Sequence, residues 1–183
     1  MLRGVTVING EGAPPVGPMD ILVEGNRIAE IRNLGILFPV PPEQRIPVRD
    51  GDRVLELDGH YLLPGFVDMH AHFGGMAQGV PAEYAAKLWL AHGITTIREP
   101  ARGNGLDWVL RHRERSERNE IAAPRILAYL RFGAGWDVPI TTEDEARRWV
   151  RDARKRGADG IKFFGAPRHV MQAALDEAAE QGL

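Results

Sequence analysis

The chain has 183 residues, a net charge of −2 and no cysteine. The near balance of charge argues against a dedicated binder of nucleic acid or anionic membranes, which would be clearly basic. The lack of cysteine excludes disulfide scaffolds, thiolate metal sites and cysteine nucleophiles.

The N-terminal segment, MLRGVTVINGEG, lacks the apolar core of a signal peptide. No apolar run approaches the ~20 residues that a membrane span needs. We therefore expect a soluble, cytoplasmic protein whose partner is a small-molecule substrate and not nucleic acid or a membrane. Assembly into a homo-oligomer stays open.

Residues 1–63 are predicted to form a small β-rich domain. The apolar residues Val5, Val7 and Ile8 predict a first strand. Alternating apolar and polar residues on both sides of Gly25-Asn26 predict a hairpin, and the same pattern around Asp58-Gly59 predicts a second one. Residues 33–52 hold four prolines and are predicted to be a loop or an insertion.

Residues 64–183 are predicted to form a second, α/β domain, because strand and helix patterns alternate there. The capping-box pair Thr142 and Glu145 marks the start of one helix. Four βα units result, and a parallel sheet is expected. The predicted strands cover residues 66–72, 94–98, 125–130 and 160–164, and the predicted helices cover 81–92, 106–117, 142–156 and 167–181.

The first strand of this α/β region carries His70 and His72 at its C-terminal end. Side chains two residues apart on a strand share a face, and their Cα atoms lie about 6.6 Å from each other. Two imidazoles at this spacing can converge on one ion. Neutral imidazole is the commonest metal ligand. The pattern is weak when taken alone, because two exposed or hydrogen-bonded histidines are also ordinary on a strand.

Three longer strings strengthen the metal hypothesis. They are PGFVDMHAH at residues 64–72, HGITTIRE at 92–99 and GADGIK at 157–162. In this order and spacing the whole chain resembles the N-terminal portion of the amidohydrolase superfamily, in particular members whose two metal ions are bridged by a carboxylated lysine. One departure stands out, since relatives more often have Asp where this chain has Glu99.

This resemblance implies a fold and an activity. Residues 1–63 would be part of a β-sandwich, and residues 64–183 would be the first half of a TIM-type (β/α)8 barrel. The activity implied is metal-dependent hydrolysis of an amide, lactam or related C–N bond, or of an ester, through a metal-activated hydroxide. The cofactor expected is one or two divalent ions, zinc first, with manganese, iron and cobalt as alternatives.

The resemblance also implies site residues. His70 and His72 match the metal ligands of the first barrel strand, and Lys162 matches the carboxylated lysine that bridges the ions. A bare ammonium beside two cations is disfavoured, whereas reaction with carbon dioxide turns it into an anionic oxygen ligand. The alternative for Lys162 is an ordinary lysine that reaches solvent from a strand end.

Two further residues have open roles. Asp68 is a candidate to orient a ligand imidazole from behind, and the alternative is a structural hydrogen-bond acceptor. Arg98 is a candidate to bind a substrate carboxylate with both guanidinium nitrogens, and the alternative is an ion pair with Glu99.

The general base lies outside this chain in the pattern of the family, which also takes two histidines and an aspartate from later strands. No catalytic residue is therefore assigned here, and we expect a fragment of a longer enzyme that is inactive alone. The alternatives are an inactive half-barrel that serves as a binding or assembly module, and a metal-free barrel enzyme. A full barrel needs at least about 200 residues, so it cannot fit here beside another domain.

Overall fold

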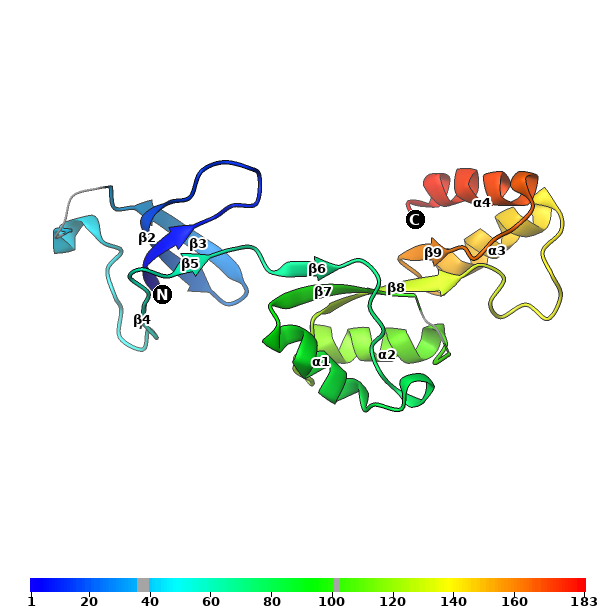
Figure 1. The fold of residues 1–183 in the computed structure, drawn as a ribbon, viewed down its shortest axis with the longest axis horizontal. Coiled ribbons are helices and arrows are strands. Elements are labelled where there is room, and N and C mark those ends of the chain that lie inside the picture. Colours follow the sequence, from blue (N-terminus) through cyan, green and yellow to red (C-terminus); the bar gives the residue numbers. More distant parts are fainter. Residues whose placement is uncertain (36–39, 101–102) are drawn as a thin grey trace. The chain divides into compact units, whose positions relative to one another are not determined.

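The computed structural model describes residues 1–35, 40–100 and 103–183. Two compact units make up the chain, Met1–Pro64 and Gly65–Leu183 (Figure 1). The first unit is built on a mixed β-sheet and the second on a parallel sheet with helices, so the fold is α/β. Within the described residues, no helix has the length and apolar character needed to cross a membrane.

The first unit holds one five-stranded sheet in the order β3-β2-β1-β4, with β5 also paired to β1. Gly25-Asn26 connects β2 and β3 as an antiparallel hairpin, which confirms that prediction. The buried Asp20 accepts a hydrogen bond from the backbone of Gly4 and lies 3.4 Å from the Arg45 guanidinium. The strands are β1 (Leu2–Val7), β2 (Val16–Glu24), β3 (Arg27–Asn33), β4 (Leu55–Glu56) and β5 (Tyr61–Leu62).

The predicted second hairpin is wrong. A turn does form at Asp58-Gly59, where the His60 N–H donates to the Leu57 carbonyl. However, β4 and β5 do not pair with each other, and both run parallel to β1 instead. The turn is a bulge opposite Gly4, and a Cβ atom at Gly4 would lie 2.3 Å from the Asp58 carboxylate. The local pattern predicted the turn, but which strand each segment pairs with depends on residues far away in the sequence.

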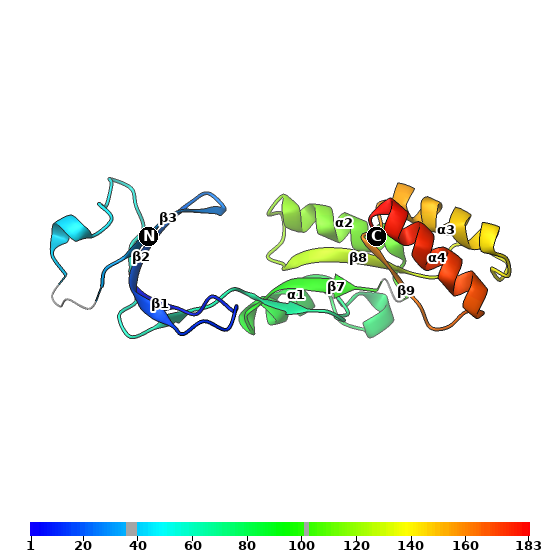
Figure 2. The ribbon, with the colours of Figure 1, turned by 90° about the horizontal axis from the view of Figure 1, so that it is seen from above.

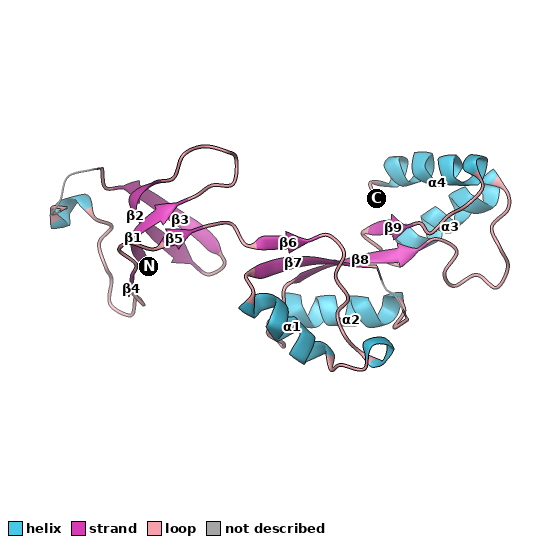
Figure 3. Ribbon diagram, in the orientation of Figure 1, coloured by secondary structure: helices cyan, strands magenta, loops and turns pink. Residues whose placement is uncertain are grey.

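The second unit alternates strands and helices along the chain (Figure 3). Its four strands are parallel and pair in sequence order, β6-β7-β8-β9 (Figure 1). Figure 2 shows β7 beside β8. The strands are β6 (Phe66–Asp68), β7 (Ile94–Glu99), β8 (Arg125–Arg131) and β9 (Gly160–Lys162), and the helices are α1 (Ala82–Ala91), α2 (Leu106–Glu117), α3 (Glu143–Lys155) and α4 (Arg168–Gln181).

One face of the parallel sheet is packed against the helices. Ile97, Ile126, Ala128 and Leu130 are buried there in a single core with apolar residues of all four helices. Alternate residues of the strands point to the other face, where arginine, tyrosine and lysine side chains are only partly buried. The functional side chains are therefore expected on that second face and on the loops that follow the strands.

Helix α3 begins at the predicted position. The Thr142 side chain accepts a hydrogen bond from the Glu145 N–H, while the Glu145 carboxylate accepts one from the Thr142 N–H. This reciprocal pair confirms the capping box. Two turns further along the helix, Trp149 is buried and its indole N–H donates to the Ala134 carbonyl at 3.1 Å.

Candidate active site

A cavity of about 680 Å³ opens at the C-terminal ends of the parallel strands. We call it the first cavity, and its walls include His70, His72, Arg131, Lys162 and Phe164. The three predicted metal ligands come from two segments about 90 residues apart in the sequence and meet in this one place. Clustering at the carboxyl ends of the strands is the arrangement that barrel-type enzymes use for chemistry.

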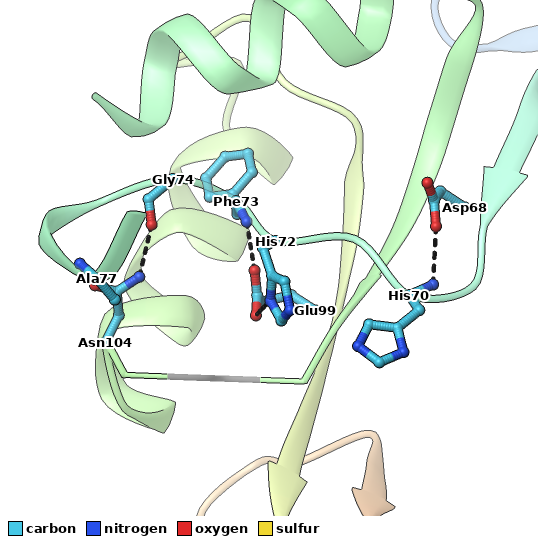
Figure 4. A network of polar contacts seen from close by, with 8 residues as sticks. All are labelled: Asp68, His70, His72, Phe73, Gly74, Ala77, Glu99 and Asn104. Atoms are coloured by element: carbon cyan, nitrogen blue, oxygen red, sulfur yellow. Dashed lines mark hydrogen bonds and ion pairs between the residues drawn. The ribbon is translucent and has the colours of Figure 1, made fainter. Parts of the chain in front are cut away.

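His70 and His72 do not lie on a strand, which corrects one step of the sequence argument. Strand β6 ends at Asp68, because the Asp68 carboxylate accepts a hydrogen bond from the His70 N–H at 2.8 Å and turns the chain. Figure 4 shows this contact, with the His70 ring pointing away from Asp68. Asp68 thus contacts the backbone of a candidate ligand and not its imidazole.

His72 is held by a buried carboxylate. Its Nδ1 lies 3.3 Å from Oε1 of Glu99, the last residue of β7. The other Glu99 oxygen accepts the Phe73 N–H (Figure 4). The Glu99 side chain is 2% exposed and that of His72 is 28% exposed. A carboxylate that accepts from Nδ1 fixes the tautomer with a lone pair on Nε2, which is then the atom available to a metal.

The GADGIK segment explains why Lys162 reaches the first cavity. Asp159 anchors the start of β9, because its carboxylate accepts the Ala128 N–H and an Arg113 N–H, each at 2.7 Å. Gly160 lets β9 pass beside Tyr129, since a Cβ atom there would lie 2.2 Å from the tyrosine ring. Lys162 follows two residues later, on the same face of the strand.

Arg98 is held on the face of the sheet that the helices leave uncovered. Its Nε donates to the Met69 carbonyl at 2.8 Å, and its guanidinium carbon lies 4.6 Å from the centre of the Tyr129 ring. The alternative ion pair with Glu99 is not formed among the described contacts, because successive strand residues point to opposite faces. Its predicted contact with a substrate carboxylate stays a prediction.

The donor set fits a divalent metal ion in part. The ring centres of His70 and His72 are 5.3 Å apart. Two imidazoles that hold one tetrahedral zinc with bonds of about 2.1 Å place their ring centres roughly 5 Å apart, so the spacing suits a shared ion. In residues 1–35, 40–100 and 103–183, no group of three or more His, Asp or Glu side chains could hold a metal. Lys162 in its carboxylated form stays the predicted third ligand from this chain.

The other histidines of the second unit make ordinary structural contacts. His92 ends α1 and its Nδ1 lies 2.7 Å from the Leu88 carbonyl. His112 makes the same kind of contact with the Trp108 carbonyl and stacks on the Trp108 ring, with 4.0 Å between ring centres. Neither lines the first cavity.

Sequence reasoning missed two residues of this site. Glu99 was noted as a departure from the usual Asp and as an alternative ion-pair partner of Arg98. However, an acid at the end of a strand next to the histidine strand is also a signal for a supporting carboxylate. Arg131 was not singled out at all. The register pairs it with Lys162 on the neighbouring strand, so both side chains point to the same face.

No protein-family profile matches the chain. Individual curated proteins do. The chain is 33% identical over 98 residues to an adenine deaminase of Paracoccus denitrificans, and the alignment covers 53% of the chain and 14% of the relative. It is 26% identical over 139 residues to an imidazolonepropionase of Pseudomonas putida, covering 69% and 32%. It is 33% identical over 99 residues to an N-acetylglucosamine-6-phosphate deacetylase of Lysinibacillus sphaericus, covering 54% and 21%.

Solved structures share the fold over the full chain. A molinate hydrolase aligns with a TM-score of 0.73 at 19% identity and covers 100% of this chain and 51% of its own. A putative prolidase from Bifidobacterium longum aligns with a TM-score of 0.69 at 24% identity, covering 100% and 47%. The chain thus spans about half the length of these structures and a third or less of the curated relatives above.

Proposed function

We propose that the chain carries part of the active site of a metal-dependent hydrolase. The proposal starts from the resemblance to the N-terminal portion of the amidohydrolase superfamily, with which these relatives agree. At the level of the family, the names of the relatives support a hydrolase of C–N bonds. The finer proposal is hydrolysis of an amide, lactam or related bond. The observation that carries it is that His70, His72 and Lys162 all line the first cavity.

Each residue has a role in this proposal. His70 and His72 would hold the metal through imidazole nitrogens, and Lys162, as a carbamate, would supply an anionic oxygen ligand. Divalent ions, zinc first, would lower the pKa of a bound water to near neutral and polarise the scissile carbonyl. Glu99 keeps the His72 ring oriented, and Asp68 holds the backbone that carries His70. Arg98 is proposed to contact the substrate.

The rest of the site is proposed to lie outside these 183 residues. The general base and the remaining ligands would come from later strands of a TIM-type barrel, of which the second unit supplies the first four βα units. The single sheet of the first unit would be one layer of a β-sandwich. The chain by itself is then expected to be inactive.

Metal analysis of the purified 183-residue chain tests this proposal. We expect His70→Ala and His72→Ala each to reduce zinc bound after equilibrium dialysis by at least tenfold at a fixed free zinc concentration, because each removes one ligand of a shared ion. Lys162→Ala should do the same, and added bicarbonate should raise zinc binding of the parent chain but not of that variant. The matched control is His169→Ala in the first turn of α4, which does not line the first cavity.

Zinc binding that is indifferent to all three substitutions would contradict the proposal. It would instead favour the second candidate, an inactive half-barrel that serves as a binding or assembly module.

A further inference from the structure

A second cavity of about 550 Å³ adjoins the first. It is formed by the loops that follow β8 and β9, and its walls include Arg131, Trp136, Asp137, Val138 and Phe164. Arg131 and Phe164 line both cavities. A molecule that occupies the second cavity therefore lies beside the site of His70, His72 and Lys162.

Arg131 is the cation among the described residues that line the second cavity, and its contacts differ from those of other arginines in the second unit. Arg98 donates to the Met69 carbonyl and Arg113 is paired with Asp159. Among the described residues, the Arg131 guanidinium forms no ion pair and no hydrogen bond. It is the last residue of β8, and its register partner on β9 is Lys162. With Lys162 proposed as a carbamate, Arg131 is the cation at these two strand ends among the described residues, and its charge favours an anion in the second cavity.

The remaining wall of the second cavity is largely apolar. Trp136 is half-buried, whereas Val138 and Phe164 are 64% and 75% exposed. Exposed apolar side chains around one cation suit a ligand that has an apolar group next to a negative charge. Asp137 is the acid among the described lining residues, and it opposes anion binding because of its like charge.

We propose that the second cavity is the substrate side pocket and selects amides that carry a carboxylate next to an apolar group, such as N-acyl derivatives of apolar amino acids. The planar guanidinium of Arg131 matches a carboxylate in a two-point contact. Trp136, Val138 and Phe164 cover the apolar group. The proposal rests on the proposed function, because it assigns the amide bond to the neighbouring first cavity.

Binding of two matched probes to the full 183-residue chain tests this side pocket. The probes are N-acetyl-L-leucine and its neutral relative N-acetyl-L-leucinamide, titrated by NMR with zinc present. We expect the carboxylate probe to bind at least tenfold more tightly. In Arg131→Gln this preference should disappear while the affinity for the amide stays the same, and Arg131→Lys should keep part of it because the charge remains without the two-point geometry.

Two further variants separate charge from packing. Asp137→Asn should strengthen binding of the carboxylate probe by a few fold and leave the amide unchanged. Trp136→Ala should weaken both probes alike. Equal affinity of the parent chain for the two probes, no saturable binding of either, or a preference that persists in Arg131→Gln would each overturn the proposal.

The same samples show whether the side pocket or the hydrolase site fails. Zinc binding of Arg131→Gln should equal that of the parent chain, since Arg131 is not a ligand. Loss of probe discrimination with normal zinc binding overturns the pocket alone. Zinc binding that is indifferent to His70→Ala, with probe discrimination retained, overturns the hydrolase and leaves an anion-binding pocket.

Discussion

At the scale of single residues, Glu99 is the group whose removal should be most informative. It is buried at the end of β7 and contacts the imidazole of His72 and the N–H of Phe73. Loss of a carboxylate behind a metal-bound histidine typically lowers metal affinity by about 10- to 100-fold. We expect Glu99→Gln to weaken zinc binding within that range and to alter the tautomer of His72, read from its ring nitrogen shifts by NMR.

Glu177 provides the matched control for Glu99. It is also a buried glutamate, but it pairs with Arg151 between α3 and α4, away from the first cavity. Glu177→Gln should lower the stability of the second unit and leave zinc affinity unchanged. Glu99→Asp should recover part of the affinity if the carboxylate acts on His72. Equal zinc affinity in Glu99→Gln and Glu177→Gln would show that Glu99 is only a structural residue.

At the scale of elements, the helices of the second unit were predicted well because their signals are local. The ends of α2 agree with the prediction, both ends of α1 and α3 differ by one residue, and α4 differs by one residue at its start only. The ends of the strands were harder to predict than those of the helices. β6 stops at Asp68 and not at residue 72, because one Asx contact turns the chain. β9 likewise ends two residues early, at Lys162.

The capping box of α3 should make the stability of the second unit depend on pH. Hydrogen bonds from the backbone of Thr141 and then of Thr142 lower the pKa of the Glu145 carboxyl from its usual value of 4.5. A group with a lowered pKa in the folded state stabilises the fold above its unfolded pKa. This contribution should therefore be complete above about pH 4.5 and be lost as the pH falls through the lower, folded-state value.

Urea unfolding between pH 2 and pH 7, roughly the range in which carboxyl groups titrate, checks this prediction. The parent chain should lose more stability on acidification than Glu145→Gln, which keeps a capping side chain without a charge. Glu143→Gln is the control, since Glu143 lies in the same first turn but outside the capping pair. Equal slopes for the parent chain and Glu145→Gln would show that the contact does not persist in solution.

At the scale of the whole molecule, the parallel sheet has two open sides. β6 and β9 each have one neighbouring strand in the described part of the chain. Large apolar side chains of β6 are exposed, with Phe66 at 60% and Val67 at 53%. Open parallel edges with apolar faces favour association, so natural proteins cover them. We propose that further strands of a longer polypeptide cover these edges in the native protein.

Intact mass spectrometry of the protein from its source tests this expectation. A mass well above the 20.3 kDa of these 183 residues would support a longer enzyme, and would direct the search to the remaining histidines and the general base. A mass of 20.3 kDa would contradict it. Catalysis would then need a partner chain, and the half-barrel module would become the leading hypothesis.

The sequence by itself determined the alternation of strands and helices, the capping box, the family resemblance and the choice of His70, His72 and Lys162. These features depend on local pattern or on strings of adjacent residues. The tertiary structure decided which strands pair with β1, where β6 turns, and that Glu99 and Arg131 join the candidate ligands. Such contacts link residues tens of positions apart, and they depend on register and on the side of the sheet each residue faces, which no local pattern specifies.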